Sequence, residues 1–230
     1  MTSLSISIRH LGHASVLIKI GAQNIYIDPS TKETGLRKED FGPSDLTLVT
    51  HSHLDHCDPD LLKKIRKGGT PIIAPEACRK ELSKLGAVWP LQPGEIMKMG
   101  NGILIRAVPA YNITRKKPSG ELFHPKDFGA GFVLTINEKR IYHAGDTDLI
   151  PEMKQLEKLA GKIDVALIPC DGFYTMDVEE ASEAAIAVNP KVVIPIHFRS
   201  ADPKAFKQKV ESKSSIKVVI LQKGEEYSLE

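Results

Sequence analysis

The stretch Thr50-His51-Ser52-His53-Leu54-Asp55-His56 places three of the chain's eight histidines within six residues. It directly follows a short apolar run that is typical of a buried strand. In an extended segment His51 and His53 point to the same side, so their imidazoles can bind one cation. Asp55 and His56 lie just beyond, at the turn into a predicted helix, and their directions suit a second cation. A solvated histidine-rich turn and a site for one metal ion are the alternative interpretations.

Two more apolar runs end in side chains of the same kind. The run that ends at His143 leads into Ala144-Gly145-Asp146, and the run 192–196 is followed by His197. The carboxyl ends of neighbouring strands in an α/β protein meet at one edge of the sheet, where binding sites are usually found. A lone histidine after a strand is most often a hydrogen-bonded core residue, but its combination with the histidine cluster favours a metal site.

The rest of the chain alternates short apolar runs with amphipathic segments. Runs 16–20 and 24–27, and later 132–136 and 141–143, are separated by turn residues and predict two hairpins. Further strands are expected at 4–8, 46–50, 71–74, 103–108, 165–168, 192–196 and 216–221, and helices at 60–66, 75–85, 153–159, 178–188 and 203–210. Each half runs from paired strands into strand–helix units, which predicts two sheets packed together with helices outside.

Length and composition describe an ordinary soluble domain. The 230 residues are 41% hydrophobic and 26% charged, which argues against disorder and suits a single domain over residues 1–230. The net charge of +2 predicts neither a nucleic-acid partner nor a membrane surface, and the apolar runs are too short to cross a bilayer. The N-terminus lacks the pattern of a signal peptide, so we expect a cytoplasmic protein. Cys57, Cys78 and Cys170 predict buried reduced thiols rather than a disulfide framework.

The order of these motifs resembles that of the metallo-β-lactamase fold superfamily of metal-dependent hydrolases. The segments that carry the resemblance are Leu11-Gly12-His13-Ala14-Ser15, Ile27-Asp28-Pro29, His51-x-His53-x-Asp55-His56, Tyr142-His143-Ala144-Gly145-Asp146-Thr147, Gly172-Phe173-Tyr174-Thr175-Met176 and Ile194-Pro195-Ile196-His197. Within the superfamily they resemble the branch that contains L-ascorbate-6-phosphate lactonase. The resemblance covers nearly the whole chain. It implies a four-layer αββα sandwich, an α/β fold with two mixed sheets packed face to face and helices outside.

The resemblance also implies a site for two divalent metal ions. By this resemblance the ligands of the first ion are His51 and His53, and those of the second are Asp55, His56 and His197. Asp146 would bridge both ions, and Asp28 would orient a ligand histidine through a hydrogen bond. A ligand set of histidine and aspartate fits zinc, and also manganese, iron or nickel.

One departure from the family pattern concerns the first ion. The family usually supplies a third histidine from the loop after a middle strand, but the corresponding segment here, Val108-Pro109-Ala110-Tyr111-Asn112, has none. His124 lies further along, in the polar loop 111–130, and loops of that length inside a domain are usually functional or mobile. We hypothesise that this loop folds over so that His124 takes the third position. A contact with substrate and a surface location are the alternatives for His124.

Two ions held in this way share a bridging hydroxide at neutral pH, and that hydroxide attacks an electrophilic carbon or phosphorus. The sequence therefore predicts a hydrolase of an ester, a lactone or a phosphodiester in a small molecule, with Asp55 and Asp146 at the catalytic centre. His143 lies one residue off the ligand pattern, and it is a candidate proton donor or a structural residue.

Four residues are candidates for substrate binding. By resemblance His13 lies near the mouth of the site, with a structural hydrogen bond as the alternative. If the long loop covers the site, Arg115 and Lys126 attract a phosphate or carboxylate, which makes the expected substrate anionic; a solvated basic loop is the alternative. Tyr174 follows the predicted strand 165–168 and is a candidate pocket residue, although plain packing explains its neighbours equally well.

Other functions stay open at this point. A ribonuclease of the same fold is disfavoured by the near-neutral charge and by the lack of a basic stripe beyond the loop. A metal-binding or ligand-sensing protein without turnover is the alternative outside the enzyme class, because fold does not settle function. A homo-oligomer is expected by resemblance alone.

Overall fold

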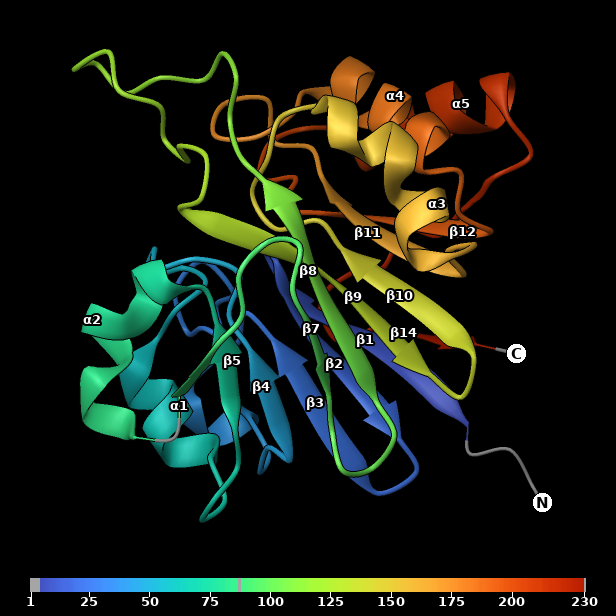
Figure 1. Cartoon of the computed structure of the whole chain (residues 1–230). Coiled ribbons are helices and arrows are strands. Elements are labelled where there is room, and N and C mark those ends of the chain that lie inside the picture. The colour runs from blue at the N-terminus through green and yellow to red at the C-terminus, as the bar shows by residue number, and fades with distance from the viewer. Residues whose placement is uncertain (1–4, 87, 230) are drawn as a thin grey trace. The chain divides into compact units, whose positions relative to one another are not determined.

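The computed structural model describes residues 5–86 and 88–229, which form two compact units. The first unit comprises the described residues up to Leu91 together with those from Leu221 onward, and the second comprises Gln92–Ile220. Each unit contains one seven-stranded sheet, and most of the strands are labelled in Figure 1. Residue 4, where the first strand was expected to begin, lies outside the described residues.

The sheet of the first unit combines strands from both ends of the chain, in the order β14-β1-β2-β3-β4-β5-β6. Their bounds are Glu226–Leu229 (β14), Ile6–Gly12 (β1), Ser15–Ile20 (β2), Gln23–Ile27 (β3), Leu46–Leu48 (β4), Ile72–Ala74 (β5) and Val88–Pro90 (β6). The pairings from β14 to β3 are antiparallel, and those from β3 to β6 are parallel. The predicted hairpin of β2 and β3 is confirmed, with Val16 opposite Ile27.

The sheet of the second unit has the order β13-β12-β11-β10-β9-β8-β7. Its strands are Lys217–Val218 (β13), Val192–Ile196 (β12), Val165–Pro169 (β11), Lys139–His143 (β10), Gly129–Ile136 (β9), Leu104–Ala110 (β8) and Ile96–Lys98 (β7). The pairings from β7 to β10 are antiparallel, and those from β10 to β13 are parallel. Both sheets are therefore mixed and share one pattern of pairing, which agrees with the expected symmetry between the two halves.

Helices connect the parallel strands of both units, and carboxylates start the main ones. The α-helices are Pro59–Ile65 (α1), Arg79–Leu82 (α2), Leu156–Ala160 (α3), Val178–Val188 (α4) and Pro203–Lys213 (α5), and the 3-10 turns are Lys38–Asp40, Glu76–Cys78, Ser83–Leu85 and Pro151–Gln155. The side chain of Asp58 accepts a hydrogen bond from the backbone N–H of Leu61, and Pro59 opens α1. Asp177 and Asp202 cap α4 and α5 in the same way.

Sequence and structure differ at the short elements. The helix expected at 75–85 is broken into two 3-10 turns around the four-residue α2, because after Pro75 only Cys78 and Leu82 are buried along it and they anchor little more than one turn. Strands β6, β7 and β14 were not predicted, since they are only three or four residues long and none of their residues is buried. The strand expected at 216–221 pairs only at Lys217–Val218.

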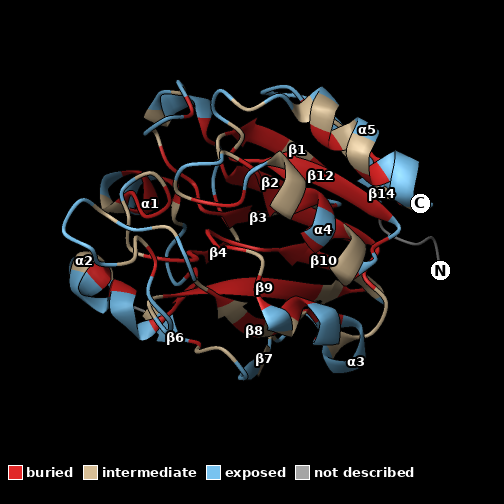
Figure 2. Cartoon of the chain, turned by 90° about the horizontal axis from the view of Figure 1, so that it is seen from above, coloured by how far each residue is buried: buried red, intermediate tan, exposed pale blue. Residues whose placement is uncertain are grey.

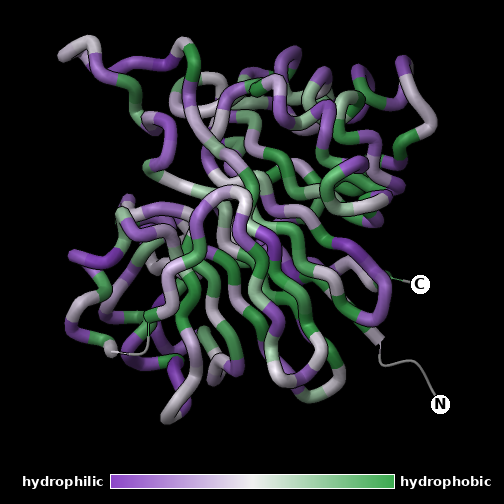
Figure 3. The backbone as a smooth tube through the Cα atoms, in the orientation of Figure 1, coloured by the Kyte–Doolittle hydropathy of each residue, from purple (hydrophilic) through white to green (hydrophobic). Residues whose placement is uncertain are grey.

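Each unit has buried apolar clusters of its own. In the first unit α1 contributes Leu61 and Ile65 to a cluster with Tyr26 and Phe41. In the second, buried residues of α4 and α5, such as Ala184 and Phe206, belong to one cluster with residues of β11 and β12, such as Ile168 and Val193. In Figure 2 most of the strands carry the red of buried residues, and in Figure 3 the green of hydrophobic residues is frequent along the strands. Among the described residues, no helix has the length and apolar character needed to span a membrane.

Tyr26 gives a test of packing in the first unit. Its side chain is buried, and its hydroxyl donates to the carbonyl oxygen of Gly42 at 3.2 Å. Burial raises the pKa of this phenol above its ordinary value of 10.0, although the charge of Arg9 opposes the shift. The folded state therefore favours the neutral phenol. This stabilisation is present below pH 10 and is lost as the pH rises through the higher pKa of the folded state.

We predict that Tyr26→Phe lowers the free energy of unfolding at pH 7 by about 1 kcal/mol, because one hydrogen bond is lost. At pH 11 the wild type is weakened by ionisation of Tyr26 in the unfolded state, whereas the variant is not, so the difference shrinks or reverses. Urea denaturation of both proteins at pH 7 and pH 11 measures the two differences. An unchanged difference at the two pH values would contradict this account of Tyr26.

Candidate functional site

Asp28 organises the candidate ligands of the first unit. It follows β3 directly, with a left-handed backbone (φ 50°), and its side chain is fully buried. One carboxylate oxygen accepts a hydrogen bond from the backbone N–H of Thr50 at 2.7 Å. The other accepts from the Thr50 hydroxyl at 2.6 Å and contacts Nδ1 of His56 at 2.8 Å. Because a carboxylate only accepts, Nδ1 of His56 donates and Nε2 is left with the lone pair that can bind a metal ion.

His51 is oriented through Thr50. Its Nδ1 lies 3.0 Å from the Thr50 hydroxyl oxygen, which already donates its one proton to Asp28 and therefore accepts here. The other ring nitrogen, Nε2, lies 3.1 Å from Nδ1 of His53. The two imidazoles expected to bind one cation are thus brought together, and Asp28 acts on both His51 and His56.

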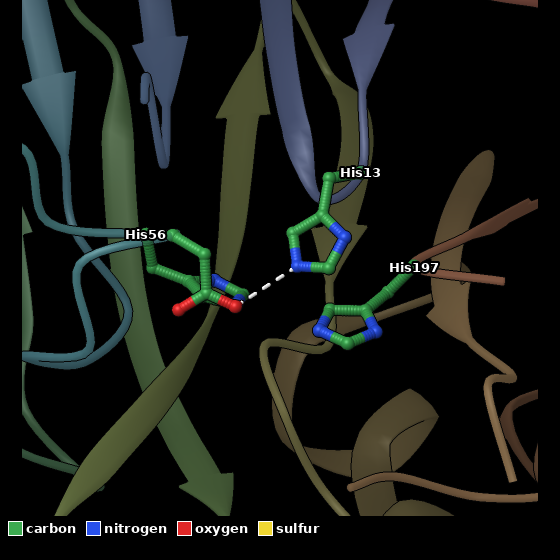
Figure 4. A group of neighbouring side chains, drawn as sticks. His13, His56 and His197 are labelled. Carbon is green, nitrogen blue, oxygen red and sulfur yellow. Dashed lines mark hydrogen bonds and ion pairs between the residues drawn. The ribbon is translucent and has the colours of Figure 1, made fainter. Parts of the chain in front are cut away.

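Asp55 and His56 form a second group, and His13 lies with them. The carboxylate of Asp55 is 3.0 Å from Nε2 of His13, the contact drawn as a dashed line in Figure 4, and 3.8 Å from Nε2 of His56. Ligand atoms of the three side chains all lie within 4.8 Å of one another. His13 also has a left-handed backbone (φ 53°), at the turn between β1 and β2. The residue expected to contact substrate therefore lies among the candidate ligands.

Asp146 is the centre of the candidate ligands in the second unit. It lies just after β10, and its Oδ2 is 3.3 Å from Nε2 of His124 and 3.3 Å from Nε2 of His197. His197 follows β12 directly, whereas His124 comes from the long loop between β8 and β9. The structure thus brings these three residues of the second unit together. The hypothesis that His124 is the third ligand of the first ion stays a prediction.

Asn112 holds His124 at this place. Its Oδ1 accepts from the backbone N–H of His124 at 2.8 Å and contacts Nδ1 of the ring at 2.9 Å. Its side-chain amide donates to Asp148 at 2.9 Å. Asp148 also accepts from the backbone N–H groups of Ile113 and Thr114, which fixes the start of the loop. Segment 108–112, which lacks the family's third histidine, therefore supplies Asn112, and Asn112 orients His124.

Asp171 orients His197 as Asn112 orients His124. Its Oδ2 lies 3.2 Å from Nδ1 of His197, and its Oδ1 accepts from the backbone N–H groups of Phe173, Tyr174 and Thr175. Burial alone would raise the pKa of this carboxyl, but His197 and the backbone N–H groups outweigh that effect and hold the pKa below its ordinary value. An ionised Asp171 favours a proton on Nδ1 of His197, which leaves Nε2 toward Asp146.

The donor set fits a divalent metal ion. Two ligand atoms bound about 2.0–2.1 Å from a tetrahedral zinc ion lie about 3.3 Å apart. The His51–His53 nitrogen pair is 3.1 Å apart, and both imidazole contacts of Asp146 are 3.3 Å. Four imidazoles also share one arrangement, in which Nδ1 lies against an oxygen and Nε2 is left as the candidate ligand atom: His51, His56, His124 and His197.

The remaining predicted residues lie as follows. His143 is buried at the end of β10, and its Nδ1 accepts from the backbone N–H of Gly145, so it shapes the turn that leads to Asp146. Arg115 pairs with Asp148 at 2.9 Å and also with Glu180, and its side chain is only 12% exposed. Lys126 lies 5.5 Å from the centre of the Tyr111 ring. The ring of Tyr174 belongs to an aromatic cluster with Phe123 and Phe173.

Sequence reasoning missed the orienting roles of Thr50, Asn112 and Asp171. Asp171 carried a usable signal, because an acidic residue two positions after a fully buried strand resembles the setting of Asp146. Asn112 was noticed only as a departure from the family pattern. Its role depends on where a loop residue 12 positions later folds back, and no local pattern gives that. The three cysteines are free and buried, as predicted.

Comparison with known proteins assigns the family. The sequence model of the beta-lactamase superfamily domain matches residues 7–197, and the chain belongs to this superfamily. The UPF0173 metal-dependent hydrolase of Pyrococcus abyssi is 35% identical to this chain, and the match covers 97% of this chain and 100% of the relative. Within the superfamily the chain is thus a member of the UPF0173 metal-dependent hydrolases.

Solved structures give the same fold. Igni18, a metallo hydrolase from the archaeon Ignicoccus hospitalis, is 28% identical and matches with a TM-score of 0.79 over 98% of this chain and 99% of its own. YhfI of Bacillus subtilis, a metallo-beta-lactamase fold protein, matches with a TM-score of 0.77 over 97% of this chain and 99% of its own at 13% identity. Together with the two mixed sheets, these matches confirm the predicted fold class.

The orienting role of Asp28 can be tested by Asp28→Asn. An amide in this place presents N–H groups to donors, so we predict that affinity for a divalent ion falls about 10- to 100-fold. Competition titration against a chromogenic chelator measures the affinity.

Asp45→Asn is the matched control. Asp45 is another carboxylate of the first unit that accepts a hydrogen bond from a backbone N–H, that of Asn24. It precedes β4, whereas Thr50 and the candidate ligands follow that strand. This control keeps wild-type affinity. Equal losses in the two variants would point to general destabilisation and not to lost orientation of His51 and His56.

Proposed function

We propose that this metal-dependent hydrolase uses two divalent metal ions to cleave an ester, lactone or phosphodiester bond in a small molecule. The ligand sets of the two units together bind the ions in this proposal. His51, His53 and His124 serve the first ion, Asp55, His56 and His197 serve the second, and Asp146 serves both. The two units then act as one hydrolase domain over residues 1–230. The match of one family model to residues in both units supports this.

The observation that carries the proposal is the common orientation of four imidazoles. In each of them an oxygen at Nδ1 leaves Nε2 as the ligand atom, although the oxygens come from four different residues: Thr50, Asp28, Asn112 and Asp171. Histidines that are merely buried need no such agreement in which nitrogen is held. Repeated orientation of the same nitrogen is what a metal site requires.

When bound, two such ions supply a hydroxide nucleophile at neutral pH and stabilise the charge that develops on the attacked carbonyl or phosphoryl group. The protein's own contribution is orientation. Asp28 and Asp171 are buried carboxylates whose contacts fix the rings that bind the ions. His13, within hydrogen-bond distance of Asp55, is placed to donate a proton to an oxygen that leaves near Asp55. Zinc is the first expectation for the ions because the donor set is histidine and aspartate.

Metal content per chain tests this proposal most directly. We predict two ions per chain in the wild type and about one in His124→Ala, because the first ion then keeps only His51 and His53 besides Asp146. Plasma mass spectrometry on protein reconstituted with each candidate metal measures the ratio. Lys126→Ala, a change two residues further along the same loop and outside the ligand set, keeps two ions.

The outcomes separate the hypotheses. Two ions in both the wild type and His124→Ala would remove His124 from the ligands. One ion or fewer in the reconstituted wild type would overturn the two-metal proposal. Two ions without hydrolysis of any lactone, ester or phosphodiester would favour a binding protein without turnover.

A further inference from the structure

Three aromatic rings of the second unit form a cluster that the metal site does not use. Phe123, Phe173 and Tyr174 contact one another in pairs, with ring centres 4.7–5.7 Å apart and mostly edge-to-face. Phe173 is 63% exposed, the largest exposed fraction among the exposed large hydrophobic side chains of the described residues. Aromatic rings contribute most to stability and binding when they are buried, so the exposure of Phe173 beside two other rings is typical of a surface that binds another group.

The cluster is tied to His124. Phe123 directly precedes that ligand in the sequence. Asn112, whose Oδ1 holds the ring of His124, donates from its Nδ2 to the carbonyl oxygen of Tyr174 at 3.1 Å. One amide therefore fixes both a candidate ligand and the backbone of the cluster.

The cluster is tied to His197 as well. Asp171 contacts Nδ1 of His197 with one oxygen and binds the backbone N–H groups of Phe173 and Tyr174 with the other, each at 2.9 Å. The two groups that orient ligands of the second unit thus also hold the aromatic residues. The rings have a fixed place beside the candidate ligands.

The surroundings of the cluster suit a flat apolar group. A cavity of about 420 Å³ lies against Phe123 and is lined by Leu122, Pro125 and Phe128, with Lys117 and Glu121 at its polar side. This volume lies in the range of small-molecule sites. The guanidinium of Arg199, two residues after His197, lies 5.1 Å from the centre of the Tyr174 ring and steadies that ring by a cation–π contact.

Arg115 and Lys126, the two cations expected to attract an anionic substrate, already have partners in the second unit. Arg115 is neutralised by Asp148 and Glu180 within its own unit. Lys126 lies over the ring of Tyr111. Recognition by apolar contact therefore has a stronger structural basis here than recognition by charge.

We propose that Phe123, Phe173 and Tyr174 form the recognition surface for an aryl group of the substrate, so that the enzyme prefers aryl-bearing esters or lactones to purely aliphatic ones. This proposal rests on the proposed function. It adds that specificity comes from ring stacking and that Asn112 and Asp171 hold this surface in register with the ligands.

The first measurement compares two lactones on the metal-loaded protein, dihydrocoumarin with its aryl ring and δ-valerolactone without one. We expect Phe173→Ala to raise KM for dihydrocoumarin about tenfold and to leave δ-valerolactone unchanged, since the variant loses both ring stacking and the burial of aromatic surface against the aryl group. Leu159→Ala, which removes another large exposed side chain of the same unit (47% exposed), changes neither substrate. An equal effect of Phe173→Ala on both lactones would overturn the proposal.

The second measurement needs no turnover. Saturation-transfer NMR and calorimetry compare the binding of phenylacetate and acetate to the wild type and to Phe173→Ala. We expect phenylacetate to bind the wild type at least about tenfold more tightly than acetate, with most of this preference lost in the variant. If neither lactone is hydrolysed but this preference is found, the aryl surface stands and the proposed reaction fails. If both lactones are hydrolysed and the preference is absent, the reaction stands and the aryl surface fails.

Discussion

An imidazole binds a metal ion only through a nitrogen without a proton. In a protein that uses histidines as ligands, the hydrogen-bond partners of each ring must therefore keep the proton on the other nitrogen. This chain does so with an oxygen at Nδ1 of His51, His56, His124 and His197. The rest of the site depends on that constraint. If Asp28 or Asp171 were displaced, the rings would be free to turn and either nitrogen could carry the proton.

Strand ends supply these oxygens because a buried carboxylate needs donors, and a chain leaving a strand has backbone N–H groups to offer. Asp28 is fully buried, and the backbone N–H and the hydroxyl of Thr50 donate hydrogen bonds that compensate its lost hydration. Thr50 lies two residues after the end of β4. Asp171 is compensated by the backbone of the segment that follows it. Three residues of the candidate site, His13, Asp28 and His197, have left-handed backbones, a conformation that is retained where surrounding contacts hold it in place.

Much of this could be predicted, and the reasons for the limits are physical. Both α4 and β12 were predicted residue for residue, because the amphipathic pattern of α4 and the fully buried apolar run of β12 are signals that each element carries in its own sequence. The ligand cluster at residues 51–56 and the strand-end residues Asp146 and His197 were likewise local. Edge strand β14 was not predicted, because its pairing partner β1 lies more than 200 residues away and the strand itself is half exposed. Asn112 was missed for a related reason, since its orienting role is visible only from the ring that it contacts.

The two sheets share their pairing pattern, yet the equivalent strand ends have exchanged roles. After β3 the carboxylate of Asp28 orients histidines, whereas after the equivalent strand β10 the carboxylate of Asp146 meets them as a candidate ligand. After β4 the chain supplies His51 and its neighbours as candidate ligands, whereas after β11 it supplies Asp171 as an orienting group. Each unit therefore contains both candidate ligands and the oxygens that orient them, although the two kinds of residue follow different strands in the two halves. Each ligand set can thus be arranged by its own unit.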